Sequence, residues 1–193
     1  MELSIYESLA NQFKPMTIHT VLLAESPPIF PDDGNVRKLK YFYNPDFVDN
    51  LKDVLLRETA KVILNRPRVA IRSKEDKIEL LKAIQRKGYF LIDAVKYPIN
   101  HLTPTERKKI ILDSVPTLIQ ELKNLKPEPE RIIILMKTIY DLTAEALTNA
   151  GLPVVPVVVY SPFNAAPKGF DYKTTLRKAL NYVQKADFKL GCN

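Results

Sequence analysis

Short apolar runs alternate with amphipathic stretches along this chain, and that alternation constrains the fold more than any other feature. The run at 131–135 is apolar after its first residue, as expected for a strand that is buried on both faces. Strands of this kind, separated by helices, are typical of a parallel sheet that is covered on both sides. The sequence therefore predicts a three-layer α/β/α fold around a central four-stranded parallel sheet. The expected strands are 20–24, 89–95, 131–135 and 154–160.

The stretches between these runs carry apolar residues at helical spacing. Asn44 and Pro45 are typical of an N-cap followed by the first helical position, so we expect a helix to begin there. Thr103 and Glu106 have the spacing of a capping box, which predicts a second helix start. The expected helices lie within 2–13, 44–65, 74–86, 103–125, 138–150 and 171–185.

Composition limits the class of protein. The chain has 193 residues, which suits a single domain, and its net charge of +7 favours a polyanionic partner such as nucleic acid. Its one cysteine, Cys192, excludes a disulfide framework and a cysteine-rich metal site held by one chain. No run is long enough to span a membrane, and the N-terminus lacks the pattern of a secretory signal. We therefore expect an intracellular monomer that uses no metal, cofactor or membrane.

Polar residues follow the expected strands where each strand ends. Glu25 comes directly after the first strand, and the rigid pair Pro27-Pro28 follows it. Asp93 lies near the end of the second strand. Because parallel strands bring their carboxyl ends to one edge, where ligands bind in open α/β sheets, the two carboxylates should lie together. Such carboxylates activate water or read a ligand, but Glu25 also suits a helix cap and Asp93 an ion pair with Lys96.

Aromatic residues supply a second set of candidates. The run Tyr41-Phe42-Tyr43 offers rings that stack on a nucleobase, or that simply fill the core. Phe163, in the long loop after the last strand, has the character of a wedge between bases. That loop is otherwise an ordinary connection.

These residues give the chain a resemblance to the uracil-DNA glycosylase superfamily. The segment 24–28, Ala-Glu-Ser-Pro-Pro, stands where one branch has Gly-Glu-Ala-Pro-Gly after its first strand. Phe42 or Tyr43 is the counterpart of that branch's base-stacking Phe. The pair Val95-Lys96 matches a second motif, Thr-Asn-Val-Val-Lys-Cys-Arg-Pro-Pro. The resemblance covers most of the chain and implies one glycosylase-like domain over 1–193.

The chain departs from the family at three places. The cysteines of that branch's iron–sulfur cluster are absent, so no cluster is expected. Asp93 replaces the Asn that reads uracil. The segment 160–164, Tyr-Ser-Pro-Phe-Asn, replaces a motif that usually begins His-Pro, and oxyanion donors of that kind contribute about 2.7–4 kcal/mol.

The resemblance implies a DNA glycosylase of base excision repair that flips out uracil or another deaminated base and hydrolyses its N-glycosidic bond. It implies catalytic roles for Glu25 and Asp93 and leaves open which of them orients the water. The alternatives are a catalytically inactive nucleic-acid-binding relative and a small-molecule hydrolase on a similar sheet. The expected substrate contacts are Ala24, Ser26, Phe42, Tyr43 and Asn164, and the expected DNA contacts are Pro27, Lys96, His101, Phe163 and Lys168.

Overall fold

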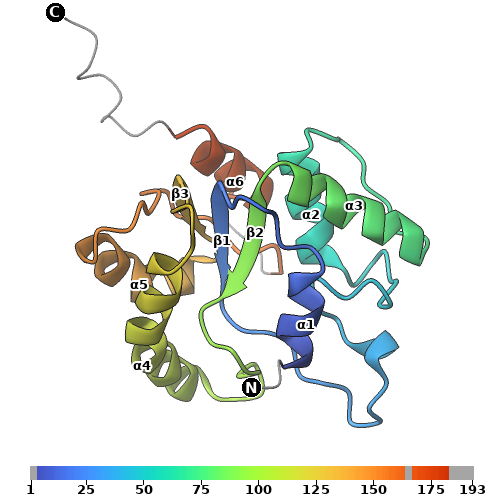
Figure 1. The fold of residues 1–193 in the computed structure, drawn as a ribbon, viewed down its shortest axis with the longest axis horizontal. Coiled ribbons are helices and arrows are strands. Elements are labelled where there is room, and N and C mark those ends of the chain that lie inside the picture. Colours follow the sequence, from blue (N-terminus) through green and yellow to red (C-terminus); the bar gives the residue numbers. More distant parts are fainter. Residues whose placement is uncertain (1–3, 164–166, 183–193) are drawn as a thin grey trace, which may run out of the picture.

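The computed structural model describes residues 4–163 and 167–182 (Figure 1). This part of the chain forms an α/β fold with six α-helices and three strands. In chain order the elements are α1 (Ile5–Asn11), β1 (Thr20–Ala24), a short 3-10 helix (Val36–Lys38), α2 (Val54–Ile63), α3 (Lys74–Arg86), β2 (Tyr89–Asp93), α4 (Pro104–Lys123), β3 (Arg131–Ile134), α5 (Lys137–Asn149) and α6 (Tyr172–Leu180).

The sheet is parallel, with β1 in the centre and the order β2-β1-β3. Thr20 pairs with Tyr89 on one side and with Arg131 on the other. Residues of β1 are buried along its whole length, as the apolar run predicted. Helix α3 packs against β2 and α5 against β3, and α4 packs against α5 (Figure 1). The predicted α/β class with a parallel sheet is confirmed at this level.

The expected strand at 154–160 does not form beyond one bridge within the described residues. Val154 makes an isolated parallel bridge with Ile132, and the Val155 amide donates to the Ile132 carbonyl at 2.9 Å. The Val157 amide then donates a hydrogen bond to the Val155 carbonyl at 2.8 Å and does not extend the pairing with β3. Pro156 has no amide hydrogen to donate, so the segment bends away after its first contact.

The helix expected from Asn44 is wrong at its start, because α2 begins ten residues later at Val54. The Asn44 side chain is completely buried, and its Nδ2 donates to the carbonyls of Val36 and Leu39 at 2.7 and 2.8 Å. Its Oδ1 accepts the Asp46 amide, which closes a turn. The amide therefore ties a loop together rather than opening a helix.

The capping box at the start of α4 is confirmed. Thr103 accepts the Glu106 amide, and the Glu106 carboxylate accepts the Thr103 amide at 2.9 Å. Pro104 occupies the first turn, where its missing amide hydrogen costs nothing. The helix start is thus fixed by local sequence, and it holds the first turns of α4 near the ends of β1 and β2.

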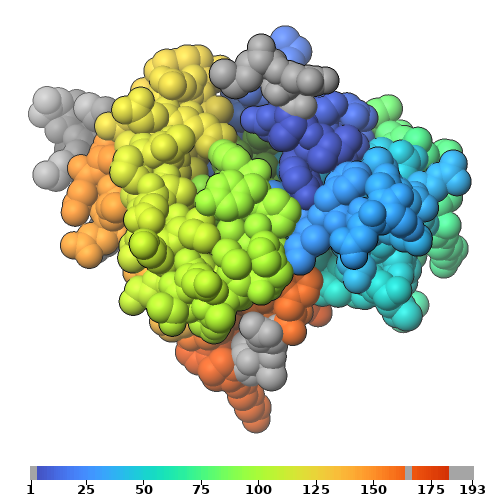
Figure 2. Space-filling model, turned by 90° about the horizontal axis from the view of Figure 1, so that it is seen from below, coloured from blue at the N-terminus to red at the C-terminus, as the bar shows by residue number. Residues whose placement is uncertain are grey.

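Figure 2 views the molecule from the end toward which β2 points. Helix α4 and the segment that follows β2 lie on one side of this face, and α1 and the loop after β1 lie on the other. No helix in the described ranges is long and apolar enough to cross a membrane.

Candidate functional site

A cavity of about 320 Å³ lies at the carboxyl ends of β1 and β2, within the range of small-molecule sites. It collects residues from the ends of both strands, the 40–42 segment, the start of α2 and the start of α4. Six of the residues expected in catalysis or in substrate and DNA contacts line it, namely Ala24, Glu25, Ser26, Phe42, Asp93 and Phe163. The expected convergence of both carboxylates and an aromatic ring at one edge of the sheet therefore exists.

Glu25 is held by Arg107 from the second turn of α4. Arg107 donates from Nε and from Nη2 to the same oxygen, Glu25 Oε1, at 2.8 and 2.5 Å. The Glu25 side chain is only 10% exposed, so this ion pair is largely shielded from water. No bond to Oε2 occurs among the described residues, so Arg107 leaves one oxygen of this cavity-lining side chain without a hydrogen bond there. The alternative of Glu25 as a helix cap is not what the structure has.

Asp93 is 92% buried, and its carboxyl group makes no hydrogen bond within residues 4–163 and 167–182. Desolvation raises the pKa of Asp93 to about 7, with Glu121 and Glu25 adding to the rise and Lys96 opposing it. The Lys96 ammonium contacts the Asp93 main-chain carbonyl at 2.8 Å and pairs with the Glu121 carboxylate. The expected Asp93–Lys96 ion pair is therefore not formed, and near neutral pH the carboxyl is partly protonated.

The three consecutive aromatics separate into different roles. All three rings are buried in the core, but Tyr41 and Phe42 also line the cavity, which Tyr43 does not. The Tyr43 hydroxyl bonds to the backbone of Leu91, and its ring packs edge-on against Phe42 with centroids 4.9 Å apart. Tyr43, an expected substrate contact, therefore does not line this cavity, because its bonds to the Leu91 backbone hold it in the core.

The expected DNA contacts are dispersed. Phe163 lines the cavity and is 58% exposed, so its ring is available to a ligand. Pro27 is buried and faces a neighbouring cavity, and Lys96 is engaged with Glu121. His101 and Lys168 are exposed and do not line this cavity. The expected substrate contact Asn164 lies outside the described residues.

Sequence reasoning missed the cations of the site. Besides Arg107, the side chains of Lys40 and Lys52 line the cavity, and both are exposed. Nothing distinguishes them from the many other basic residues of the chain. The one available signal was the capping box, since a helix that starts beside the sheet edge directs its early residues toward that edge.

A buried ion pair holds part of the cavity wall in place. Lys77 of α3 is completely buried, and its ammonium lies 2.5 Å from Asp53, the N-cap of α2, which also lines the cavity. The same ammonium donates to the Phe47 carbonyl at 3.1 Å. Burial lowers the pKa of Lys77 and raises that of Asp53, each against the partner's opposing charge. This pair joins α3, the start of α2 and the preceding loop.

No group of three or more His, Cys, Asp or Glu side chains with metal-binding geometry occurs in the described part of the chain. Comparisons of the chain with protein-family models, curated proteins and solved structures gave no match.

Proposed function

We propose that this protein is a monofunctional DNA glycosylase that hydrolyses the N-glycosidic bond of uracil or a related deaminated base. The observation that carries the proposal is the cavity at the sheet edge, where an ion-paired Glu25, a protonatable Asp93 and the ring of Phe42 meet. Its volume of about 320 Å³ accommodates a single flipped base. The likeness of the 24–28 and 92–100 segments to uracil-DNA glycosylases points the same way.

The two carboxyl groups differ in environment, and this difference suggests their roles. Glu25 sits against a guanidinium, which matches an anionic carboxylate, and its Oε2 has no bond within the described chain. An anionic oxygen at a cavity wall accepts a hydrogen from water and orients the water oxygen toward the sugar. Glu25 is therefore assigned to orient the attacking water, and Arg107 is the residue that positions Glu25.

Asp93 is assigned to the recognition of the nucleobase. A neutral carboxyl group presents one donor and one acceptor, which complements the N–H and C=O of a lactam edge. Uracil, hypoxanthine and xanthine all carry that edge, whereas cytosine and adenine carry an amino group there instead. Because the pKa of Asp93 is about 7, the neutral form is well populated at slightly acidic pH.

In the reaction, the water oxygen bonds to C1′ of the deoxyribose as the bond from C1′ to the base nitrogen breaks. The bonding electrons leave with the base, and the Asp93 hydroxyl stabilises the charge that develops on the base oxygen. Glu25 takes one proton from the water, and that proton finally reaches the departing base. We assign the exposed Lys40 to the neutralisation of a phosphate, with Lys52 joining it if a phosphate displaces its partner Asp49, and the exposed Phe163 ring to the vacated stack.

The proposal is tested with duplex and single-stranded oligonucleotides that contain one uracil, hypoxanthine or xanthine. We expect alkali-labile abasic sites to accumulate with wild-type protein and not with Glu25→Gln. Excision should fall as the pH rises through about 7 in wild type, and this fall should be absent in Asp93→Asn, since an amide does not titrate. Folded protein that binds DNA with a steep salt dependence but cleaves none of these substrates would instead be the non-catalytic relative.

A further inference from the structure

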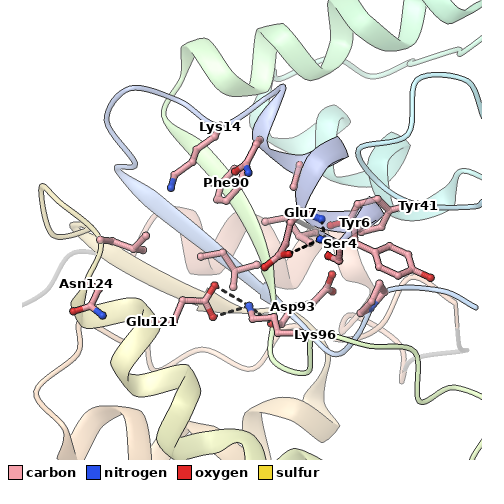
Figure 3. Close-up of a pocket in the computed structure, with 16 residues that line it drawn as sticks. Ser4, Tyr6, Glu7, Lys14, Tyr41, Phe90, Asp93, Lys96, Glu121 and Asn124 are labelled. Carbon is pink, nitrogen blue, oxygen red and sulfur yellow. Dashed lines mark hydrogen bonds and ion pairs between the residues drawn. The ribbon is translucent and has the colours of Figure 1, made fainter. Parts of the chain in front are cut away.

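A second cavity, of about 380 Å³, lies beside the first between α1 and the end of α4 (Figure 3). Figure 2 shows a recess between these two helices on the face at which β2 ends. The cavities share three wall residues, Tyr41, Leu91 and Asp93, which stand between them. Nothing in the proposed glycosylase reaction uses this second space.

The charges around the end of β2 do not balance. Three carboxyl groups interact there, Glu25, Asp93 and Glu121. Arg107 pairs with Glu25, and Lys96 pairs with both oxygens of Glu121 at 2.6 and 2.8 Å, as the dashed lines in Figure 3 show for the second pair. Asp93 has no cation of its own among the described side chains, although it is 92% buried and lines the cavity. When Asp93 is ionised, this cluster therefore has one carboxylate more than it has cations.

The chain's other ammonium group on this lining does not supply the charge. Lys14 also lines the cavity, and Figure 3 draws no ion pair between it and Asp93. Glu7 increases the imbalance, because its carboxylate caps the α1 N-terminus at Ser4 and remains anionic on the same lining. A ligand that brings a positive charge to Asp93 would therefore be stabilised by more than one carboxylate.

The remainder of the lining selects the body of that ligand. Part of the lining is apolar: Phe90 and Ile92 come from β2, Ala10 from α1 and Leu125 from the segment after α4. An inorganic cation leaves such a wall uncovered, whereas an aromatic or branched alkyl group buries it at about 25 cal/mol per Å². A hydrated metal ion also requires several oxygen ligands, and no metal-binding cluster occurs in the described ranges.

We infer that the cavity between α1 and α4 is a binding site for a small organic amine, whose ammonium group pairs with Asp93 and whose apolar body packs on Phe90 and Ile92. The site is separate from the space assigned to the flipped base, and it meets that space only at the shared wall.

Binding of the amine is coupled to the ionisation of Asp93. The groups that face Asp93 come from several elements. They are Glu25 after β1, Lys96 after β2, Glu121 of α4, Tyr6 of α1, and Tyr41 and Tyr43 of the loop between the 3-10 helix and α2. Of these, only Lys96 favours the ionised form of Asp93, so an incoming ammonium supplies what the cluster lacks. Below about pH 7, amine binding should therefore release a proton, and it should strengthen as the pH rises toward about 7 and level off above it.

The test is calorimetric titration of the full chain with 2-phenylethylamine and with 2-phenylethanol, an uncharged analogue of similar shape. A primary alkylamine stays protonated at pH 6 and pH 8, as a lysine side chain does. We expect the amine to bind at least tenfold more tightly than the alcohol at pH 8, with a smaller preference at pH 6. Equal affinity for the two compounds at pH 8 would overturn the inference.

Variants locate the binding. Asp93→Asn should weaken amine binding at least tenfold at pH 8 and remove its pH dependence, whereas Glu128→Gln, at an exposed carboxylate, should change neither. Asn124→Trp, at an exposed position that lines this cavity alone, should weaken the amine and the alcohol together while sparing uracil binding. Amine affinity that survives both Asp93→Asn and Asn124→Trp would overturn the inference, whether or not the protein excises any base.

Discussion

Both donors that Arg107 directs at Glu25 reach one carboxylate oxygen, at 2.8 and 2.5 Å, although the two residues are 82 positions apart. A guanidinium fork more often contacts both oxygens of a carboxylate. Here Oε2 accepts no hydrogen bond from Arg107, so the pair fixes the orientation of Glu25 and uses only one of its oxygens. Two predictions follow from this geometry, one for each partner.

Glu25→Gln should remove the negative charge that orients the water, while it keeps the shape of the side chain. An amide oxygen still accepts from Arg107, so we expect the fold to persist and excision to fall about a hundredfold or more. The measurement is single-turnover excision of uracil beside affinity for the same oligonucleotide, which should change little. Glu128→Gln is the control, because its carboxylate is exposed. A Glu25→Gln protein with wild-type turnover would remove Glu25 from the reaction.

Arg107→Lys keeps the positive charge but loses the planar fork. A single ammonium cannot reproduce two donors at fixed angles, so Glu25 should adopt more than one orientation. We expect excision to fall on the order of tenfold to a hundredfold, since small displacements of a catalytic group have effects of that size. The fall should appear in kcat rather than KM. Arg37→Lys, at an exposed position of the 3-10 helix, should leave kcat unchanged.

The sequence predicted this edge of the sheet but not the ion pair within it. The apolar runs fix β1 and β2, and parallel pairing then brings Glu25 and Asp93 together, because Ala24 pairs with Asp93 in register. Arg107 reaches the site only through the packing of α4, and periodicity along a helix does not reveal which distant residue it will meet.

Two departures from the expectations arise from hydrogen bonds to the backbone that local sequence does not specify. Asn44 has the side chain of an N-cap, yet its amide is used by the carbonyls of the preceding loop. Tyr43 has the ring of a stacking residue, yet its hydroxyl is held by the Leu91 backbone. In both cases a tertiary partner competes with the local pattern and prevails.

Asp93 should make the stability of the fold depend on pH. Burial raises its pKa to about 7, whereas the pKa of an aspartate in an unfolded chain is about 3.9. Its contribution to the free energy of unfolding is thus complete below about pH 4 and is lost as the pH rises to 7. The loss from this group is at most about 4 kcal/mol. Urea unfolding of wild type and Asp93→Asn should be compared between pH 5 and pH 8. The difference between their free energies of unfolding should shift in favour of the variant as the pH rises, and a constant difference would contradict the assignment.

Lys77→Met should destabilise the fold more than any exposed charge change. It leaves Asp53 buried without its cation, and losing one partner of a buried pair costs about 3–5 kcal/mol. The double variant Asp53→Asn with Lys77→Met should recover part of the loss, because no buried charge remains. Lys74→Met removes only an exposed pair with Asp46 and should cost less than about 1 kcal/mol. Chemical denaturation of the four proteins measures these differences directly.

Occupation of the second cavity by an amine should inhibit excision, if Asp93 reads the base as a neutral acid. The two cavities share this residue, and an ammonium on one side stabilises the ionised form that has no hydrogen to donate on the other. We expect 2-phenylethylamine to lower the rate of uracil excision. It should also weaken uracil binding, and uracil should weaken amine binding by the same factor, as linkage between two binding equilibria requires. 2-Phenylethanol should not inhibit, since it brings no charge, and the variant Asn124→Trp should resist inhibition because it fills the amine cavity only. Inhibition that is equal for the amine and the alcohol would mean competition by shape within the base cavity, and the coupling through Asp93 would then be rejected.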